Sequence, residues 1–316
     1  MSLAPVIFDS FETAPEFAPL RQALQAGDWA AFERAIGTLP TDVAGTALSG
    51  LSDVHGIEAI LEREVAAHPE SAWASTALAL RYITIGWAIR TGNLAKNVSN
   101  TQFQQFFEWL ERAEEILAEV TAQHPDFPHA WSAQLLTARG LQLDVDETRR
   151  RYDRYALLSP HDLPAQEQML QKLLPKWSGS WEQSEAFVRE STMAAPPGSN
   201  PFALVAVLHV ERWVDLDDDD ESEAYFTRPE VVAELRDAAA SLLQGDRHID
   251  PTSVKAHTAF AMAFWMGKHF DDAAVHVRLL DGRAHEFPWY FVTESARKLT
   301  SINRQILGEK KKWFGR

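Results

Sequence analysis

The sequence predicts an all-α fold, an irregular α-solenoid of about 13–15 helices stacked as antiparallel pairs. Apolar residues recur with the 3.6-residue period of helices, and the strict alternation of strands is almost absent. A joint between two apolar-periodic segments also occurs twice, as His68-Pro69-Glu70-Ser71-Ala72-Trp73 and as His124-Pro125-Asp126-Phe127-Pro128-His129-Ala130-Trp131. Internal similarity of this kind indicates helical hairpins stacked along one axis.

Ten helices are expected before the clearest linker. They cover residues 15–26, 29–37, 41–53, 56–68, 71–90, 102–123, 128–141, 144–158, 163–174 and 181–193. Side-chain oxygens that can accept from free amide groups mark four starts, at Asp28, Ser71, Thr101 and Ser180. Prolines mark four ends, because proline cannot continue a helix; they are Pro69, Pro125, Pro160 and Pro175. The polar run 92–100 is expected to be a loop.

The segment 194–201 contains Pro196, Pro197 and Gly198 and is the expected domain linker. It divides the chain into helical repeat regions at residues 1–195 and 200–316, which we expect to be continuous with each other. Asn200 before Pro201 is a strong helix start. The helices expected after it are 201–213, 228–244, 252–267, 271–284 and 288–307. The acidic run 215–223 is interpreted as a solvated loop, with binding of a hard cation as the less favoured alternative.

Composition limits the possible functions. The net charge of −15 disfavours binding to nucleic acid or to an anionic membrane. With no cysteine, the chain cannot form disulfides or thiolate metal sites. The apolar stretch 72–89 is interrupted by Arg81 and is typical of a buried helix rather than a membrane span. No secretory signal is visible near the start, so a cytoplasmic location is expected.

Three segments resemble helical hairpins of the tetratricopeptide type. Gly267-Lys268-His269-Phe270-Asp271-Asp272-Ala273-Ala274 fits best, Gly27-Asp28-Trp29-Ala30-Ala31-Phe32 is a looser match, and Pro125 stands where such a unit ends. The resemblance implies small residues where paired helices touch and an aromatic side chain between layers. Trp73 and Trp131 are further apart than the roughly 34 residues of one repeat, so the array is irregular.

A second resemblance lies at Pro175-Lys176-Trp177-Ser178-Gly179-Ser180. This segment is similar to the Pro-Lys-Trp-Gly-Gly-Ser motif of a bacterial family of unknown function that is also built of helical hairpins. Ser178 replaces the first glycine, which puts the backbone geometry of that position in question. The resemblance implies a fold and brings no activity with it.

Arg81, Arg139, Trp177 and Trp181 are the candidate binding residues. Each arginine follows its joint tryptophan by the same interval, so both guanidinium groups could project from one wall and bind a partner's carboxylate. Pairing of each arginine with a glutamate inside the chain is the favoured alternative. Trp177 and Trp181 flank a glycine turn and are the best candidates for partial exposure, although packing is preferred even there. Six other tryptophans are expected in the core: Trp73, Trp87, Trp109, Trp131, Trp213 and Trp265.

No catalytic, metal or cofactor site can be assigned. The sequence has no H-E-x-x-H, no phosphate-binding glycine loop and no G-x-S-x-G elbow. His257, His269 and His276 lie near Asp271 and Asp272 without a metal-ligand spacing. His209 is expected to be a hydrogen-bonded histidine in the core or at its boundary.

The expected function is a non-catalytic, protein- or peptide-binding scaffold whose partner is basic or of mixed charge, with no nucleic acid and no membrane involved. The alternative is an enzyme or small-molecule binder with a pocket between the two helical halves. A homodimer is a further prediction, because apolar residues in 289–306 could form an exposed terminal layer.

Overall fold

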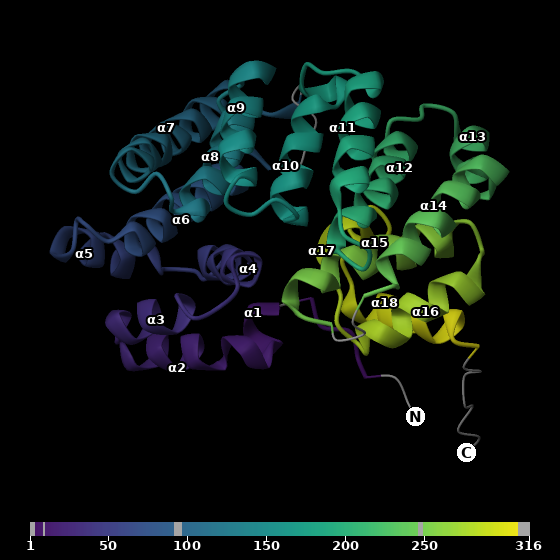
Figure 1. The fold of residues 1–316 in the computed structure, drawn as a ribbon, viewed down its shortest axis with the longest axis horizontal. Coiled ribbons are helices and arrows are strands. Elements are labelled where there is room, and N and C mark those ends of the chain that lie inside the picture. The colour runs from purple at the N-terminus through teal and green to yellow at the C-terminus, as the bar shows by residue number, and fades with distance from the viewer. Residues whose placement is uncertain (1–3, 9, 92–96, 246–248, 309–316) are drawn as a thin grey trace. The chain divides into compact units, whose positions relative to one another are not determined.

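The computed structural model describes residues 4–8, 10–91, 97–245 and 249–308, and the fold of these residues is all-α (Figure 1). They contain no strand, and one isolated parallel bridge joins Ile7 to Arg283. Most of the loop expected at 92–100 and the basic tail at 310–316 lie outside the described residues. None of the described helices is long and apolar enough to cross a membrane.

The chain forms two compact units. The N-terminal unit is Ala14–Gln183, and the C-terminal unit combines Met1–Thr13 with Ser184–Arg316. The sequence-based division at residues 195–200 stays a prediction. The segment that suggested it is anchored within the C-terminal unit, because the amide of Gly198 donates to the carbonyl of Ser241 at 2.8 Å. A Cβ atom at Gly198 would lie 2.2 Å from the Cα of Gly245, so this approach requires glycine.

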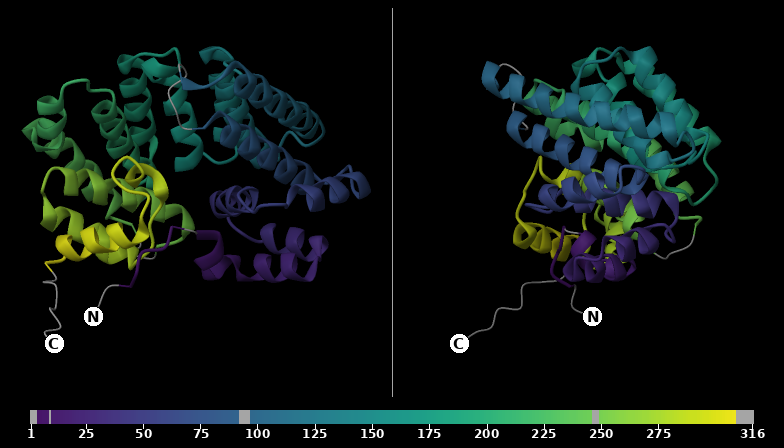
Figure 2. Two further views of the ribbon diagram at one scale, coloured as in Figure 1. Left: turned by 180° about the vertical axis from the view of Figure 1, so that it is seen from behind. Right: turned by 90° about the vertical axis from the view of Figure 1, so that its left-hand side faces the viewer.

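The helices of the N-terminal unit lie close to their expected positions. They are α2 (Ala18–Ala26), α3 (Trp29–Ile36), α4 (Thr41–Ser52), α5 (Glu58–Ala67), α6 (Ala72–Arg90), α7 (Asn100–Gln123), α8 (Pro128–Gly140), α9 (Val145–Ala156), α10 (Leu163–Leu173) and the first turn of α11 (Trp181–Ala194). A 3₁₀ turn at Pro15–Phe17 precedes α2. The long helices α6 and α7 lie side by side (Figure 2), and α8 packs against both.

The expected caps explain most of these starts. Asp28 accepts from the amide of Ala31 at 2.8 Å, and Ser71 accepts from that of Ala74 at 3.0 Å. Thr101 was the wrong cap for α7. Ser99 holds that end instead, in a capping box with Gln102 that satisfies two free amide groups reciprocally.

The C-terminal unit contains the rest of α11 and the helices that follow. These are α12 (Leu204–Val214), α13 (Asp219–Ala224), α14 (Pro229–Leu242), α15 (Pro251–Met266), α16 (Phe270–Leu280), α17 (Glu286–Trp289) and α18 (Ala296–Ile306), with α1 (Ser10–Thr13) from the start of the chain. The segment before α1 joins this unit through Ile7, whose amide donates to the carbonyl of Gly282 at 2.9 Å.

Three expectations for the C-terminal unit were wrong. The single helix expected at 288–307 is broken between α17 and α18. Part of the acidic run forms α13, because Asp218 accepts from the amide of Glu221 at 2.9 Å and starts a helix. Asn200 does not cap, and its side chain donates to Thr252 at 3.0 Å instead.

The core is less rich in tryptophan than expected. Of the six tryptophans assigned to it, Trp131 is buried at 8 % exposure, and the other five are half-buried. Trp29 and Trp289 are buried instead. The apolar residues of 289–306 differ in exposure. Trp289, Leu299, Ile302 and Ile306 are buried, Phe291 and Val292 are half-buried, and Tyr290 is 47 % exposed. The homodimer stays a prediction.

Candidate functional site

The two copies of the joint meet in the N-terminal unit. Trp73 of the first copy contacts Phe127 of the second edge-on, with ring centres 4.8 Å apart, and lies at the same distance from the ring of His129. The prolines end α5 and α7 as expected, and the rings fill the space between the helices that follow. The repeat therefore corresponds to two helix pairs in direct contact.

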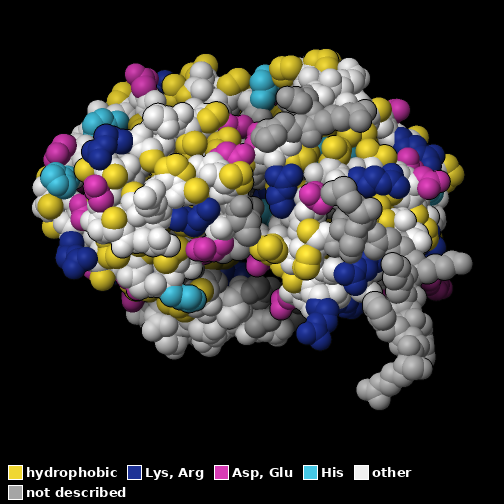
Figure 3. All heavy atoms as spheres, turned by 90° about the horizontal axis from the view of Figure 1, so that it is seen from below, with side chains coloured by type: hydrophobic (Ala, Val, Ile, Leu, Met, Phe, Trp, Pro, Cys, Tyr) yellow, Lys and Arg dark blue, Asp and Glu magenta, His cyan; other side chains and the backbone are white. Residues whose placement is uncertain are grey.

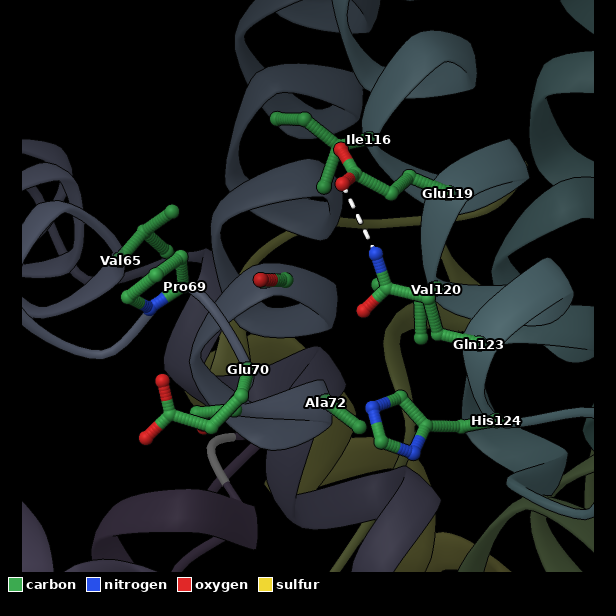
Figure 4. A pocket seen from close by; sticks show the side chains of 11 residues that line it. Val65, Pro69, Glu70, Ala72, Ile116, Glu119, Val120, Gln123 and His124 are labelled. Carbon is green, nitrogen blue, oxygen red and sulfur yellow. Dashed lines mark hydrogen bonds between the residues drawn. The ribbon is translucent and has the colours of Figure 1, made fainter.

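Two hollows lie beside the first joint. The wide hollow, about 540 Å³, is formed by the turn between α2 and α3, by α5 and by the joint itself. The narrow cavity, about 100 Å³, lies between the first joint, α6 and α7, and reaches the second joint at His124 (Figure 4). Glu70 and Ser71 line both. The turn between α2 and α3 and the two joints thus border the wide hollow and the narrow cavity.

The wide hollow has an acidic lining. It includes four carboxylates and no lysine or arginine; the nine lining residues are Gly27, Asp28, Trp29, Ala30, Glu33, Glu64, His68, Glu70 and Ser71. Glu33 is held in place, because its Oε1 accepts from the indole nitrogen of Trp29 at 2.8 Å and from the hydroxyl of Ser71. The carboxylates come from four different segments that converge only in the folded chain.

The narrow cavity combines apolar walls with polar groups. Side chains of α7 extend toward α6 across it, and the amide nitrogen of Gln123 donates to Glu119 at 2.9 Å (Figure 4). The ring of His124 points toward Ala72. Its lining also contains no lysine or arginine.

Arg81 is paired within the chain. Its side chain is buried and donates to Glu58 and to the carbonyl of Ser52, both at 2.9 Å. A hydrogen bond from its own backbone amide, and then one from Arg81, hold the pKa of Glu58 below its usual value despite burial. The favoured alternative, pairing inside the chain, is correct for this residue. A role of Arg81 in ligand binding stays a prediction.

Arg139 and Trp177 are brought together as half-buried side chains. The guanidinium carbon of Arg139 lies 4.9 Å from the ring centre of Trp87 and 5.4 Å from that of Trp177. Arg90 lies over the same two rings, at 5.5 Å and 5.9 Å. This cluster is a packing unit of cation–π contacts. Arg81 is not part of it, so the two arginines do not share one wall. Trp181 is half-buried as well.

The Pro-Lys-Trp-Ser-Gly-Ser segment is a tight turn that places Trp177 in this cluster. Pro175–Trp177 forms one 3₁₀ turn, and the amides of Trp177 and Gly179 both donate to the carbonyl of Leu174, at 2.9 and 3.1 Å. Ser178 adopts φ = +81°, the left-handed conformation that glycine tolerates best. Ser178 thus keeps the turn that a glycine would allow.

The histidines form internal contacts. His257 and His276 share a hydrogen bond between their Nδ1 atoms at 2.8 Å, and His209 bonds Tyr225 and Glu234. Burial lowers the pKa of His257 to about 4. Among the described residues, no three His, Asp or Glu side chains are placed to hold a metal ion.

Charge is mixed on the face of the molecule shown in Figure 3. On the face in Figure 3, lysine and arginine side chains are separated by acidic, apolar and uncharged atoms, and that face has no continuous basic field. Comparison with family models, with curated proteins and with solved structures finds no match. The two family resemblances therefore stay predictions.

Sequence reasoning missed the residues of the wide hollow. Asp28 was assigned only as a cap and Ser71 likewise, while Glu33 and Glu64 were not singled out. A usable signal was present, because Asp28, Glu70 and Ser71 all lie at expected interhelical turns. Their convergence with Glu33 and Glu64 required the packing of α3 against the first joint.

Proposed function

We propose that this protein is a non-catalytic scaffold of stacked helix pairs, related to tetratricopeptide-type proteins, that binds a basic segment of another protein in the wide hollow. The proposal includes a cytoplasmic location. The single observation that carries it is the lining of the hollow, in which Asp28, Glu33, Glu64 and Glu70 are accompanied by no lysine or arginine, and His68 is the only basic side chain.

Charge complementarity supports this partner. Carboxylates placed together repel one another, and a lysine- or arginine-containing segment relieves that repulsion when it binds. A hollow of about 540 Å³ is large enough for side chains of an extended segment. The net charge of −15 adds a long-range attraction that speeds encounter with a basic partner.

The test is binding of an array of basic peptides at several salt concentrations. We expect retention at low salt that weakens as salt rises, because exposed charges are screened. The double variant Glu64→Gln/Glu70→Gln should weaken binding by roughly tenfold, which corresponds to about 1.4 kcal/mol.

The matched control is Glu111→Gln/Glu115→Gln. Both residues are exposed on α7 and line neither hollow, so the control removes the same charge from the same unit. Equal weakening by the two double variants would mean that overall charge, and not the hollow, attracts the peptide. Absence of any bound peptide at low salt would remove the basis of the scaffold function.

A further inference from the structure

The narrow cavity is lined by Ser75, a mostly buried residue. Ser75 is 6 % exposed, lines the cavity, and its Oγ makes no hydrogen bond to a described residue. It follows Ser71 by one helical turn on the same face of α6. The hydroxyl of Ser71 already has hydrogen-bond partners, since it accepts from the amide of Ala74 and donates to Glu33. The Oγ of Ser75 is not among the fully enclosed polar atoms of the described residues, so we expect a bonding partner to reach it from the cavity that Ser75 lines.

The other polar groups of the cavity are mainly acceptors. The Gln123 amide nitrogen is used by Glu119, which leaves the Gln123 carbonyl oxygen as an acceptor. The carboxylates of Glu70 and Glu119 add negative charge to the lining. Glu70, Glu119 and Gln123 are exposed at the edge of the cavity, so a ligand that brings several donors and a positive charge is complementary to them.

The cavity walls fit an aliphatic chain. Val65, Pro69, Ala72, Ile116 and Val120 supply apolar surface around the same space. A volume of about 100 Å³ is more than a single water needs and too small for a folded element. A slender apolar stem with a compact charged end matches both the walls and the acceptors.

We infer that the narrow cavity is a subsite for one lysine side chain of the bound partner, with its ammonium group donating to Ser75, Glu119 and Gln123. This inference rests on the proposed function, because the lysine belongs to the same basic segment that occupies the wide hollow, and Glu70 lines both spaces. Lysine fits better than arginine, since its three donors diverge from one atom and the acceptors come from different side chains rather than from one coplanar carboxylate.

The experiment measures fluorescence anisotropy of a labelled peptide with four lysines separated by Gly-Ser pairs. The full chain is titrated at low salt, and the same peptide with Nε-acetylated lysines serves as the uncharged probe. We expect Ser75→Ala and Glu119→Gln each to weaken binding by roughly three- to tenfold. Ser75→Ala removes a hydrogen-bond acceptor for the ammonium group, and Glu119→Gln removes the negative charge beside that group. The acetylated peptide should not bind measurably.

Glu111→Gln is the matched control, since it removes one exposed carboxylate from α7 outside the cavity, and its affinity should stay within about twofold of the parent protein. In spectra of the ¹⁵N-labelled protein, the peptide should shift the amide signals of Ser75 and Gln123.

The outcomes separate the two proposals. If the parent protein binds the peptide, but Ser75→Ala and Glu119→Gln bind as tightly, the lysine subsite is refuted and the scaffold function remains. Equal weakening by Glu119→Gln and Glu111→Gln also refutes the subsite. If the parent protein does not bind the peptide at all, the proposed function itself fails.

Discussion

The turn at Ser178 and Gly179 gives a stability prediction with opposite signs at neighbouring residues. Ser178 has φ = +81°, and an L-residue in this left-handed region costs roughly 1–2 kcal/mol. Ser178→Gly removes this cost but gives the unfolded chain more freedom, which costs about 0.5–1 kcal/mol. The net expectation for Ser178→Gly is stabilisation by about 0.5–1 kcal/mol.

Gly179→Ala should do the reverse. A Cβ atom at Gly179 would lie 1.9 Å from the carbonyl oxygen of Leu173 and 2.3 Å from its carbonyl carbon. Both atoms belong to the backbone, so the turn must move. Forced repacking of this kind costs about 1–3 kcal/mol. Movement of the turn would also withdraw Trp177 from Arg139, now at 5.4 Å.

Calorimetry of the full chain measures both variants, and tryptophan fluorescence reports the cluster. For a unit of this size, 1 kcal/mol shifts the midpoint by about 2–4 °C. We expect Ser178→Gly to raise the midpoint and leave the emission unchanged, and Gly179→Ala to lower the midpoint and alter the emission. A Ser178→Gly protein that unfolds earlier than its parent, or a Gly179→Ala protein of unchanged stability, would refute this account of the turn.

Two further predictions concern buried charge. Arg81→Met should lower the free energy of unfolding in urea by about 1–3 kcal/mol, since it leaves Glu58 unpaired in a partly screened site. The control is Arg63→Met at an exposed position, for which the free energy of unfolding should change by less than about 0.5 kcal/mol. Burial lowers the pKa of His129 to about 4 from its usual value of about 6.5, so the unfolded chain binds the proton first. Stability is therefore full above pH 6.5 and falls as the pH drops toward 4, by roughly 2 kcal/mol for this residue between pH 7 and 5. Urea unfolding at pH 7 and pH 5 measures this loss of stability, and His129→Phe should reduce it by the contribution of His129. A loss as large as that of the parent protein would contradict the role of His129. The control is His68→Gln at an exposed position.

The helices were predictable because their determinants are local. Apolar periodicity, proline stops and caps such as Asp28 and Ser71 act within a few residues of one another. Failures occurred where local signals competed. Ser99 and Thr101 were both good caps, and the capping box with Gln102 decided between them. Asn200 satisfied a distant threonine rather than its own helix.

The candidate site was less predictable than the fold. Arg81 and Arg139 share a sequence interval after a tryptophan, yet one is paired with Glu58 and the other stacks on Trp87 and Trp177. Sequence intervals place residues along a helix, whereas the neighbouring helices determine which groups each side chain meets. The acidic run 215–223 was prominent in the sequence, but the carboxylates of the wide hollow are dispersed along the chain.

By itself, the sequence determined an all-α protein, the approximate limits of most helices, the repeated joint and the absence of cysteine chemistry. These properties depend on short-range geometry and composition. Tertiary structure alone decided that the two joints pack on each other, that residues near Ile7 pair beside Gly282, and that Glu33, Glu64 and Glu70 line one hollow. The reason is physical: contacts between residues far apart in sequence form only when whole helices bury their apolar faces together, and no local pattern encodes that choice of neighbours.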